Sequence, residues 1–251
     1  MHEIKICADD RVYMEKETRA KIISLATGLL VAFSMIYTAE KIGQVYTMGK
    51  AALSAKDSYV VVVDAGHGGF DPGKVGINGA EEKEINLAIA KKVAEYLEAG
   101  DVKVIMTRED DAGLYDPASD NKKVQDMKKR VEIMDSAQPD LIVSIHQNSY
   151  PEEYVHGAQV FYHKDSEAGK ELADCIQKQF VKLVDPENNR QIKANDSYYL
   201  LKKTAMPIVI VECGFLSNSA EAAKLITARY QDRVAWAVYM GVMNYLHGGM
   251  K

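Results

Sequence analysis

YVVVVDAGHGG, residues 59–69, is the stretch that decides the fold expected for this chain. Its four consecutive valines form an apolar run too short for a typical helix, and β-branched runs of this kind are typical of strands buried on both faces of a parallel sheet. The run ends at Asp64, and glycines then flank His67, where they remove side-chain bulk and permit unusual backbone angles. Ligands of open α/β sheets bind beyond the carboxyl ends of strands. The stretch therefore predicts either a functional imidazole or a glycine turn with an incidental histidine.

The composition indicates one globular domain with an appendage. The chain has 251 residues, of which 47% are hydrophobic, enough for a sizeable core. A formal net charge of −5 gives no electrostatic footprint for nucleic acid, so we expect no nucleic-acid partner. The three cysteines, Cys7, Cys175 and Cys213, form neither a disulfide framework nor a spaced zinc-finger set.

An uncharged apolar segment, Ile22 to Tyr37, lies near the start of the chain. Its length suits the core of a long signal peptide, and extension to Ala39 makes a thin membrane span. A buried helix in a soluble fold is less favoured, because the apolar residues cover every face. We expect residues 1–39 to be a cytoplasmic tip followed by a cleaved signal or an uncleaved membrane anchor. Residues 40–57 would be a linker, and residues 58–251 an exported domain.

Strand and helix patterns alternate through the rest of the chain. Apolar strands are predicted at 102–107, 141–146, 157–162 and 208–211, and amphipathic helices at 81–100, 124–134, 168–183 and 230–245. Ser219 is a candidate cap for the last helix. Lys128, Lys129 and Arg130 suit a solvated helix face, and Tyr198 and Tyr199 favour a groove. The alternation predicts a single three-layer α/β domain, with a mainly parallel twisted sheet and helices on both faces.

Three of the predicted strands end on chemistry-bearing side chains. The strand LIVSIH, residues 141–146, ends on His146. The first strand leads to His67, and the last strand leads to Glu212. In a parallel sheet these ends lie on one edge, so the side chains could converge. Three more acids, Glu81, Glu82 and Glu84, open the next helix, where the helix dipole alone favours carboxylates.

Two imidazoles and a carboxylate are a known ligand set for catalytic zinc, with water in the fourth position. Zinc-bound water is a nucleophile near neutral pH, and a carboxylate outside the metal shell can transfer its protons. Spacing alone leaves open which glutamate has which role, since no local HExxH motif is present. Two alternatives rank lower. One is Cys213 as a nucleophile with a histidine. The other is phosphate binding by AGHGG, which lacks the P-loop signature.

Several motifs together resemble one enzyme family. VDAGHGG, NGAEEKEINLAIA, MTRED, SIHQNS, GAQVFY and VECGFLSN occur in the order and spacing of the zinc-dependent N-acetylmuramoyl-L-alanine amidases, the amidase-3 family. The resemblance runs from about Tyr59 to the C-terminus. In that family the glutamate of a Glu-Lys pair opening the first helix binds the metal. The resemblance therefore implies His67, Glu82 and His146 as zinc ligands and Glu212 as the catalytic acid/base.

The same resemblance suggests residues that contact substrate. The candidates are Arg108, Arg130, Asn148 and Tyr198, and the two arginines could instead be structural. Gln147 stands where relatives carry a smaller or apolar residue, and Asp135 where many have asparagine. Neither departure touches the implied metal set.

The implied reaction is hydrolysis of the amide between N-acetylmuramic acid and the L-alanine of peptidoglycan. Zinc-bound water attacks the carbonyl, and Glu212 passes the water proton to the leaving amine. The interval from His146 to Gly157 has no room for the inhibitory helix of some members, although an activator protein could still be needed.

The short build most resembles spore-cortex amidases, which prepare muramic lactam formation and hence germination. We expect this enzyme to act on the outer face of the membrane, in the cell wall or in the forespore intermembrane space. The alternatives are a zinc peptidase that cuts within the stem peptide and a non-catalytic peptidoglycan-binding protein.

Overall fold

The computed structural model describes residues 19, 21, 23–25, 27–39, 41 and 58–248. The chain divides into two units, Met1–Lys56 and Asp57–Lys251. The described residues of the first unit are helical, and their large apolar side chains are exposed. Among the described residues, no helix has both the length and the apolar character needed to cross a membrane. Residues 1–18 of the predicted tip and anchor, and the predicted linker apart from residue 41, lie outside the described residues.

The second unit is built on a six-stranded sheet with the strand order β2-β1-β3-β6-β4-β5. The strands are β1 (Val60–Ala65), β2 (Lys103–Met106), β3 (Leu141–Asn148), β4 (Gln159–His163), β5 (Lys193–Asn195) and β6 (Ile208–Phe215). Strands β2, β1, β3 and β6 pair in parallel, and β4 runs antiparallel to β6. The predicted mainly parallel sheet is confirmed.

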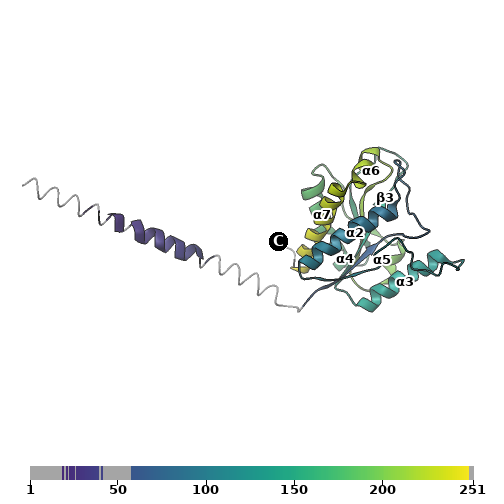
Figure 1. Ribbon diagram of the computed structural model, residues 1–251, viewed down its shortest axis with the longest axis horizontal. Coiled ribbons are helices and arrows are strands. Elements are labelled where there is room, and N and C mark those ends of the chain that lie inside the picture. Colours follow the sequence, from purple (N-terminus) through teal and green to yellow (C-terminus); the bar gives the residue numbers. More distant parts are fainter. Residues whose placement is uncertain are drawn as a thin grey trace, which may run out of the picture. The chain divides into compact units, whose positions relative to one another are not determined.

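Helices cover both faces of this sheet (Figure 1), which confirms the three-layer arrangement. The helices are α2 (Glu82–Ala99), α3 (Lys122–Ala137), α4 (Glu167–Gln179), which continues as a π-helical turn (Phe180–Val184), α5 (Tyr199–Lys203), α6 (Ser219–Leu225) and α7 (Ala228–Leu246). Residues from α2, α4 and α7 share one buried cluster with the sheet, whereas α3 and α5 contribute to the other.

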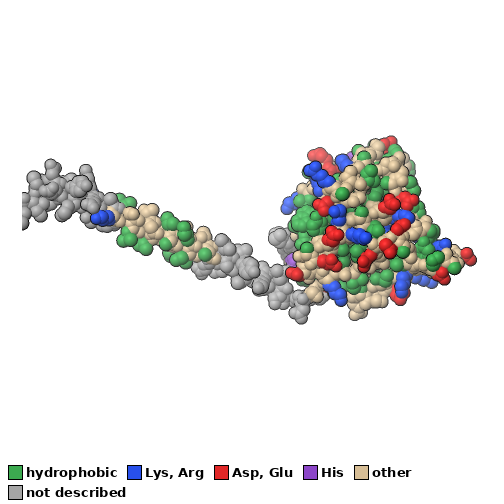
Figure 2. All heavy atoms as spheres, viewed as in Figure 1, with side chains coloured by type: hydrophobic (Ala, Val, Ile, Leu, Met, Phe, Trp, Pro, Cys, Tyr) green, Lys and Arg blue, Asp and Glu red, His purple; other side chains and the backbone are tan. Residues whose placement is uncertain are grey.

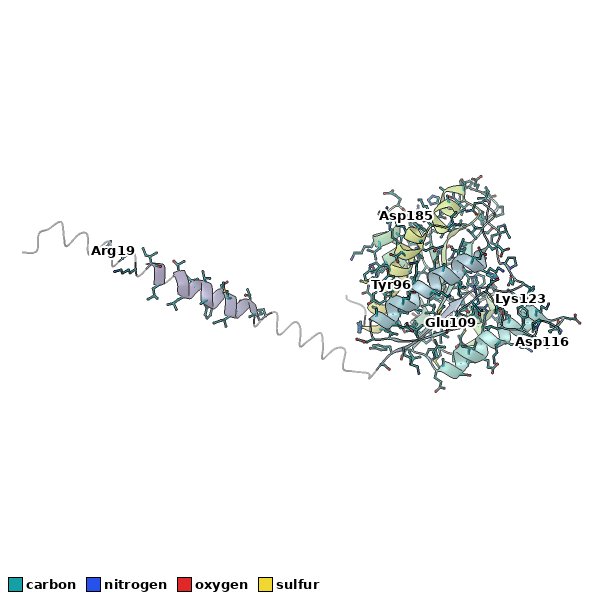
Figure 3. All side chains as sticks on the ribbon, in the orientation of Figure 1. Arg19, Tyr96, Glu109, Asp116, Lys123 and Asp185 are labelled. Carbon is teal, nitrogen blue, oxygen red and sulfur yellow. The ribbon has the colours of Figure 1, made fainter. Side chains whose placement is uncertain are left out.

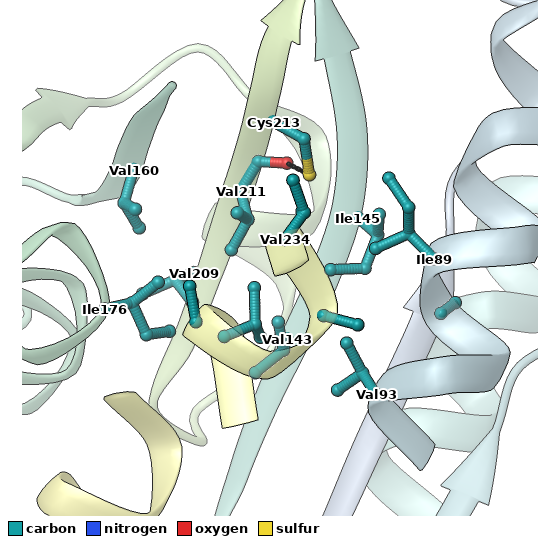
Figure 4. Close-up of a cluster of buried hydrophobic side chains, with 14 of the residues drawn as sticks. Ile89, Val93, Val143, Ile145, Val160, Ile176, Val209, Val211, Cys213 and Val234 are labelled. Atoms are coloured by element: carbon teal, nitrogen blue, oxygen red, sulfur yellow. Dashed lines mark hydrogen bonds between the residues drawn. The ribbon is translucent and has the colours of Figure 1, made fainter. Parts of the chain in front are cut away.

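The valine run serves both layers at once. Val61 and Val63 belong to the cluster under α2, α4 and α7, and Val62 belongs to the cluster under α3 and α5. All three are fully buried, as alternation along a strand covered on both sides requires. Figure 4 shows the larger cluster, in which side chains of α2 and α4 meet β3, β4 and β6.

The end of the chain differs from the prediction of one last helix. The structure has two helices, α6 and α7, separated at Ile226 and Thr227. Ser219 does not cap: the Asn218 side chain accepts from the backbone N–H of Glu221 at 2.9 Å, and Thr227 caps α7. A side-chain oxygen one residue before the first helical residue is the favoured cap, so the boundary lies one residue earlier than expected.

The surface of the second unit carries charged side chains of both signs (Figure 2), as expected from a composition with similar numbers of basic and acidic residues. On the face drawn in Figure 2, acidic and basic side chains of the second unit are interspersed. Lys128 and Lys129 are exposed on α3 as expected, but Arg130 is only 1% exposed. The prediction that Arg130 belongs to a solvated face is therefore wrong, because buried carboxylates draw its guanidinium inward.

Candidate active site

Three of the predicted side chains converge at the carboxyl edge of the sheet. One ligand atom each from His67, Glu82 and His146 lies within 4.8 Å of the others. His67 follows β1, Glu82 is the first residue of α2, and His146 lies in β3, which continues two residues further than expected. They line a cavity of about 570 Å³. The topology thus brings together residues that are far apart in the sequence.

Glu82 lies between the two imidazoles. Its Oε1 is 3.2 Å from Nε2 of His67 and 3.0 Å from Nδ1 of His146. Burial raises the pKa of Glu82, but the hydrogen bonds with both histidines outweigh burial and hold it well below its usual range. A buried carboxylate that stays ionised beside two imidazole nitrogens is a donor set that suits a divalent cation, because metal and proton compete for the same atoms.

His67 is oriented by Asp71, which the sequence analysis missed. Nδ1 of His67 lies 2.9 Å from Oδ2 of Asp71, which leaves Nε2 facing Glu82. Asp71 in turn pairs with Lys123, labelled at the start of α3 in Figure 3. Burial lowers the pKa of His67, but the hydrogen bonds to Asp71 and Glu82 outweigh burial and raise it to about 9. A carboxylate behind an imidazole is the usual second layer of a metal site.

Two buried amides support Glu82 from behind. Nδ2 of Asn86, one helical turn along α2, donates to Oε1 of Glu82 at 3.2 Å and to the Gly66 carbonyl at 3.1 Å. Nε2 of Gln147 donates to Oδ1 of Asn86 at 3.1 Å, and the Gln147 backbone N–H donates to Oε1 of Glu82 at 3.0 Å. A polar Asn86 among the apolar residues of the α2 face was the sequence signal for this role.

Asp64, the last charged residue of β1, is hydrogen-bonded to residues other than His67. It is fully buried and accepts hydrogen bonds from Arg130 at 2.6 Å and from Thr107 at 2.7 Å. Ser144 also donates to it. Burial raises the pKa of Asp64, but Arg130 and these hydroxyls outweigh burial and lower it to about 2. Asp64 therefore anchors a buried ion pair below the site.

Arg108 and Arg130 hold the loop that carries His67. Arg130 donates to the carbonyls of Ala65 and His67, and Arg108 donates to those of Ala65 and Gly66. Both arginines are buried. Arg130 borders the cavity, whereas Arg108 does not. The Arg108 donors are directed at backbone carbonyls, whereas Arg130 also donates to the carboxylates of Asp64 and Asp126.

Glu212 lies in the next strand and also lines the cavity. It pairs in register with His146, within β6 rather than at its end, and is 7% exposed. Its Oε2 is buried without a hydrogen-bond partner among the described residues. Burial raises the pKa of Glu212 to about 7. This carboxyl group can therefore take up and release a proton near neutral pH.

The remaining predicted residues are distributed as follows. Asn148, Tyr198 and Tyr199 line the cavity, which confirms a groove position for the two tyrosines. Burial and the charge of Glu212 raise the pKa of Tyr198 to about 12. Cys213 is fully buried in the core (Figure 4), where burial raises the pKa of its thiol, so it is no nucleophile for this cavity.

Comparison with known proteins decides the family. Residues 61–244 match the family model Amidase_3, described as N-acetylmuramoyl-L-alanine amidase. The chain belongs to this family. The amidase activity expected from the sequence is thereby confirmed, and its substrate is peptidoglycan.

Individual relatives agree with this family. The chain is 34% identical over 189 residues to the germination-specific N-acetylmuramoyl-L-alanine amidase of Bacillus subtilis, covering 74% of this chain and 79% of that protein. A solved structure of the CwlD amidase from Clostridioides difficile, in complex with the GerS lipoprotein, has 42% identity and a TM-score of 0.74, covering 75% of this chain and 98% of that chain. An N-acetylmuramoyl-L-alanine amidase from Clostridium difficile 630 has 32% identity and a TM-score of 0.69, covering 77% and 99%.

Proposed function

We propose that this amidase depends on zinc held by His67, Glu82 and His146, with Glu212 as its acid/base. The observation that carries the proposal is the convergence of the three ligand atoms within 4.8 Å in a cavity that also contains an unpaired buried carboxylate oxygen. When bound, zinc makes water a nucleophile near neutral pH and polarises a carbonyl oxygen.

The chain's own residues would transfer the proton. Glu212 accepts a proton from the attacking water through its unpaired oxygen and returns it to the nitrogen of L-alanine as the amide bond breaks. Because burial raises the pKa of Glu212 to about 7, both protonation states of its carboxyl group are populated near neutral pH. Tyr198 lines the same cavity as Glu212. The products are a muramic acid carboxyl group and a free stem peptide.

We further propose that the enzyme acts in the spore cortex after export, with the N-terminal segment as signal or anchor. The support is the similarity to a germination-specific amidase and to an amidase solved with a lipoprotein. That complex also supports an activator protein as a partner of this chain. The segment between β3 and β4 consists of a loop with turns, so it contains no helix that covers the site.

Metal analysis combined with product identification tests the proposal. Purified full-length protein should contain one zinc per chain and should release intact stem peptides from peptidoglycan, with free muramic acid carboxyl ends in mass spectrometry. Shortened peptides on intact muramoyl-alanine links would instead indicate a peptidase. His146→Ala should lose zinc, and undiminished zinc would remove His146 from the ligand set.

Glu212→Gln separates catalysis from binding. The variant should keep its zinc and lose roughly 10²- to 10⁴-fold in kcat, because the amide cannot accept the water proton. Glu221→Gln is a matched control, since Glu221 is another buried glutamate but caps backbone N–H groups of Phe215 and Gly157 away from the cavity. Full hydrolysis by Glu212→Gln would overturn the assignment.

A further inference from the structure

The cavity has two chemically different walls. One wall is largely apolar and comes from α3 and α5, with Val124, Met127 and Leu200 among its residues. The other wall is polar and comes from the loop after β1 and the end of β3, where Lys74, Asn148 and Ser149 lie. A substrate that carries a sugar on one side of the scissile amide and a charged peptide on the other would meet different surfaces on the two sides.

Lys74 differs from the other basic residues around the cavity. Lys123 is paired with Asp71, and Arg130 is paired with Asp64 and Asp126. Among the residues that the structure describes, Lys74 has no ion-pair partner, and it is exposed at the cavity rim. Its ammonium is therefore available to an anionic group of the substrate.

The position of Lys74 relative to the reacting centre is fixed by its backbone. Its N–H donates to Oε2 of Glu82 at 2.8 Å, so the residue begins beside a ligand carboxylate. The loop is further held by the N–H of Ile77 on the Leu216 carbonyl, and the N–H of Leu216 on the Asn148 carbonyl, both at 2.9 Å. Lys74 and Asn148 thus belong to one backbone-linked rim rather than to independent loops.

We propose that Lys74 binds the free α-carboxylate of the second stem residue, D-glutamate, and selects it over D-isoglutamine. That carboxylate lies one residue beyond the scissile bond, and an extended residue spans at most about 3.6 Å. A lysine anchored beside the metal ligand carries its charge on a flexible four-carbon stem and can reach this distance. The amide of isoglutamine is uncharged, so it cannot form an ion pair with the Lys74 ammonium. The polar wall therefore receives the peptide, and the apolar wall the sugar. The inference rests on the amidase reaction and adds a substrate preference to it.

The test uses two synthetic disaccharide peptides that differ only in D-glutamate or D-isoglutamine at the second position. The wild-type enzyme should prefer the acid by roughly tenfold in kcat/KM, mainly through KM, because the ion pair is present in both ground and transition states. Lys74→Met should remove the preference by weakening only the acid substrate, and Lys74→Arg should restore it. Zinc content and kcat should stay unchanged.

Lys91→Met is the matched control, since Lys91 is an exposed lysine of α2 outside the cavity. It removes the same net charge and should keep the full preference. A wild-type enzyme without preference, or a Lys74→Met variant that keeps it, would overturn the proposal. Equal losses on both substrates would also overturn it, by placing Lys74 in support of Glu82. Failure to cleave either substrate at the lactyl–alanine amide would instead contradict the proposed function itself.

Discussion

The imidazole of His146 packs against the backbone of Gly66, so closely that a β-carbon added at Gly66 would lie 2.3 Å from Cε1 and Nε2. Real β-carbons do not approach other atoms this closely, so one of the two residues would have to move. The glycine after β1 is therefore required by the neighbouring imidazole and not only by a turn. The other two glycines of the motif, Gly68 and Gly69, face Arg108 and Tyr115 instead.

Gly66→Ala should therefore displace His146 and abolish metal binding, with activity lost in proportion. Gly79→Ala is the control, because Gly79 has a positive φ of 81° but no atom within 4 Å of the added β-carbon. It should cost roughly 1–2 kcal/mol of stability from backbone strain and leave zinc binding intact. Zinc titration by calorimetry on both variants distinguishes the steric effect from a general loss of stability. Normal zinc affinity in Gly66→Ala would contradict the contact.

The orientation of His67 by Asp71 gives a second prediction. Asp71→Asn should weaken zinc binding by roughly 10- to 100-fold, as expected when the group behind a metal-binding histidine is lost. The isosteric amide keeps the volume but removes the charge that favours the cation. Competition with a chelator of known affinity measures the change.

Asp111→Asn is a suitable control. The Asp111 carboxylate pairs with Lys83 Nζ at a distance of 2.8 Å, and Asp111 does not line the cavity that contains the proposed metal ligands. Unchanged affinity in this variant, together with a loss in Asp71→Asn, would place the effect at His67. Equal affinities in both variants and the wild type would remove Asp71 from the site.

The two buried amides give a third prediction. Gln147→Leu removes the donor that holds Asn86, so the Asn86 amide can rotate and present oxygen rather than nitrogen to Glu82. We expect a 10- to 100-fold loss of zinc affinity with the fold intact. Gln147→Glu should be at least as damaging, because a carboxylate cannot donate to Oδ1 of Asn86.

Gln177→Leu is the control for burial. Gln177 is a buried glutamine that bonds the backbone of Val160 and Ala158. Its loss should lower the free energy of unfolding by about 1–3 kcal/mol, through the unpaired groups it leaves, without changing zinc affinity. If Gln147→Leu behaved in the same way, its role would be structural only.

The sequence predicted the edge of the sheet well, but it did not distinguish among the three acids beside it. Short runs of β-branched residues are typical of buried strands, and parallel strands place His67, His146 and Glu212 on one edge of the sheet. Glu82 could not be chosen from three neighbouring acids by spacing. The structure shows that it shares a buried face with Ile85, one turn along α2, while Glu84 points to solvent.

The support of the site was less predictable for a physical reason. Asp71 contacts His67 through the conformation of a loop, and Asn86 contacts Gln147 through an amide hydrogen bond between segments far apart in the sequence. Such contacts have no sequence period. Arg130 was assigned to solvent because a charged side chain is usually exposed. Its buried position is explained by two buried partners, Asp64 in β1 and Asp126 in α3.

The Asp64–Arg130 pair gives the last prediction, a dependence of stability on pH. Asp64 has a pKa of about 2 in the folded protein and 3.8 as the ordinary value. A lowered pKa contributes stability that is present above about pH 4 and is lost as the pH falls through 2. The difference of nearly two units corresponds to about 2 kcal/mol. Denaturant unfolding between pH 5 and pH 2 should show this loss, which Asp64→Asn should lack because its side chain does not titrate. Asp64→Asn should also be less stable at pH 7 by about 3–5 kcal/mol, since it leaves Arg130 buried without its charge partner. If the two proteins lost stability in parallel as the pH fell, the titration would have to be assigned to other carboxylates.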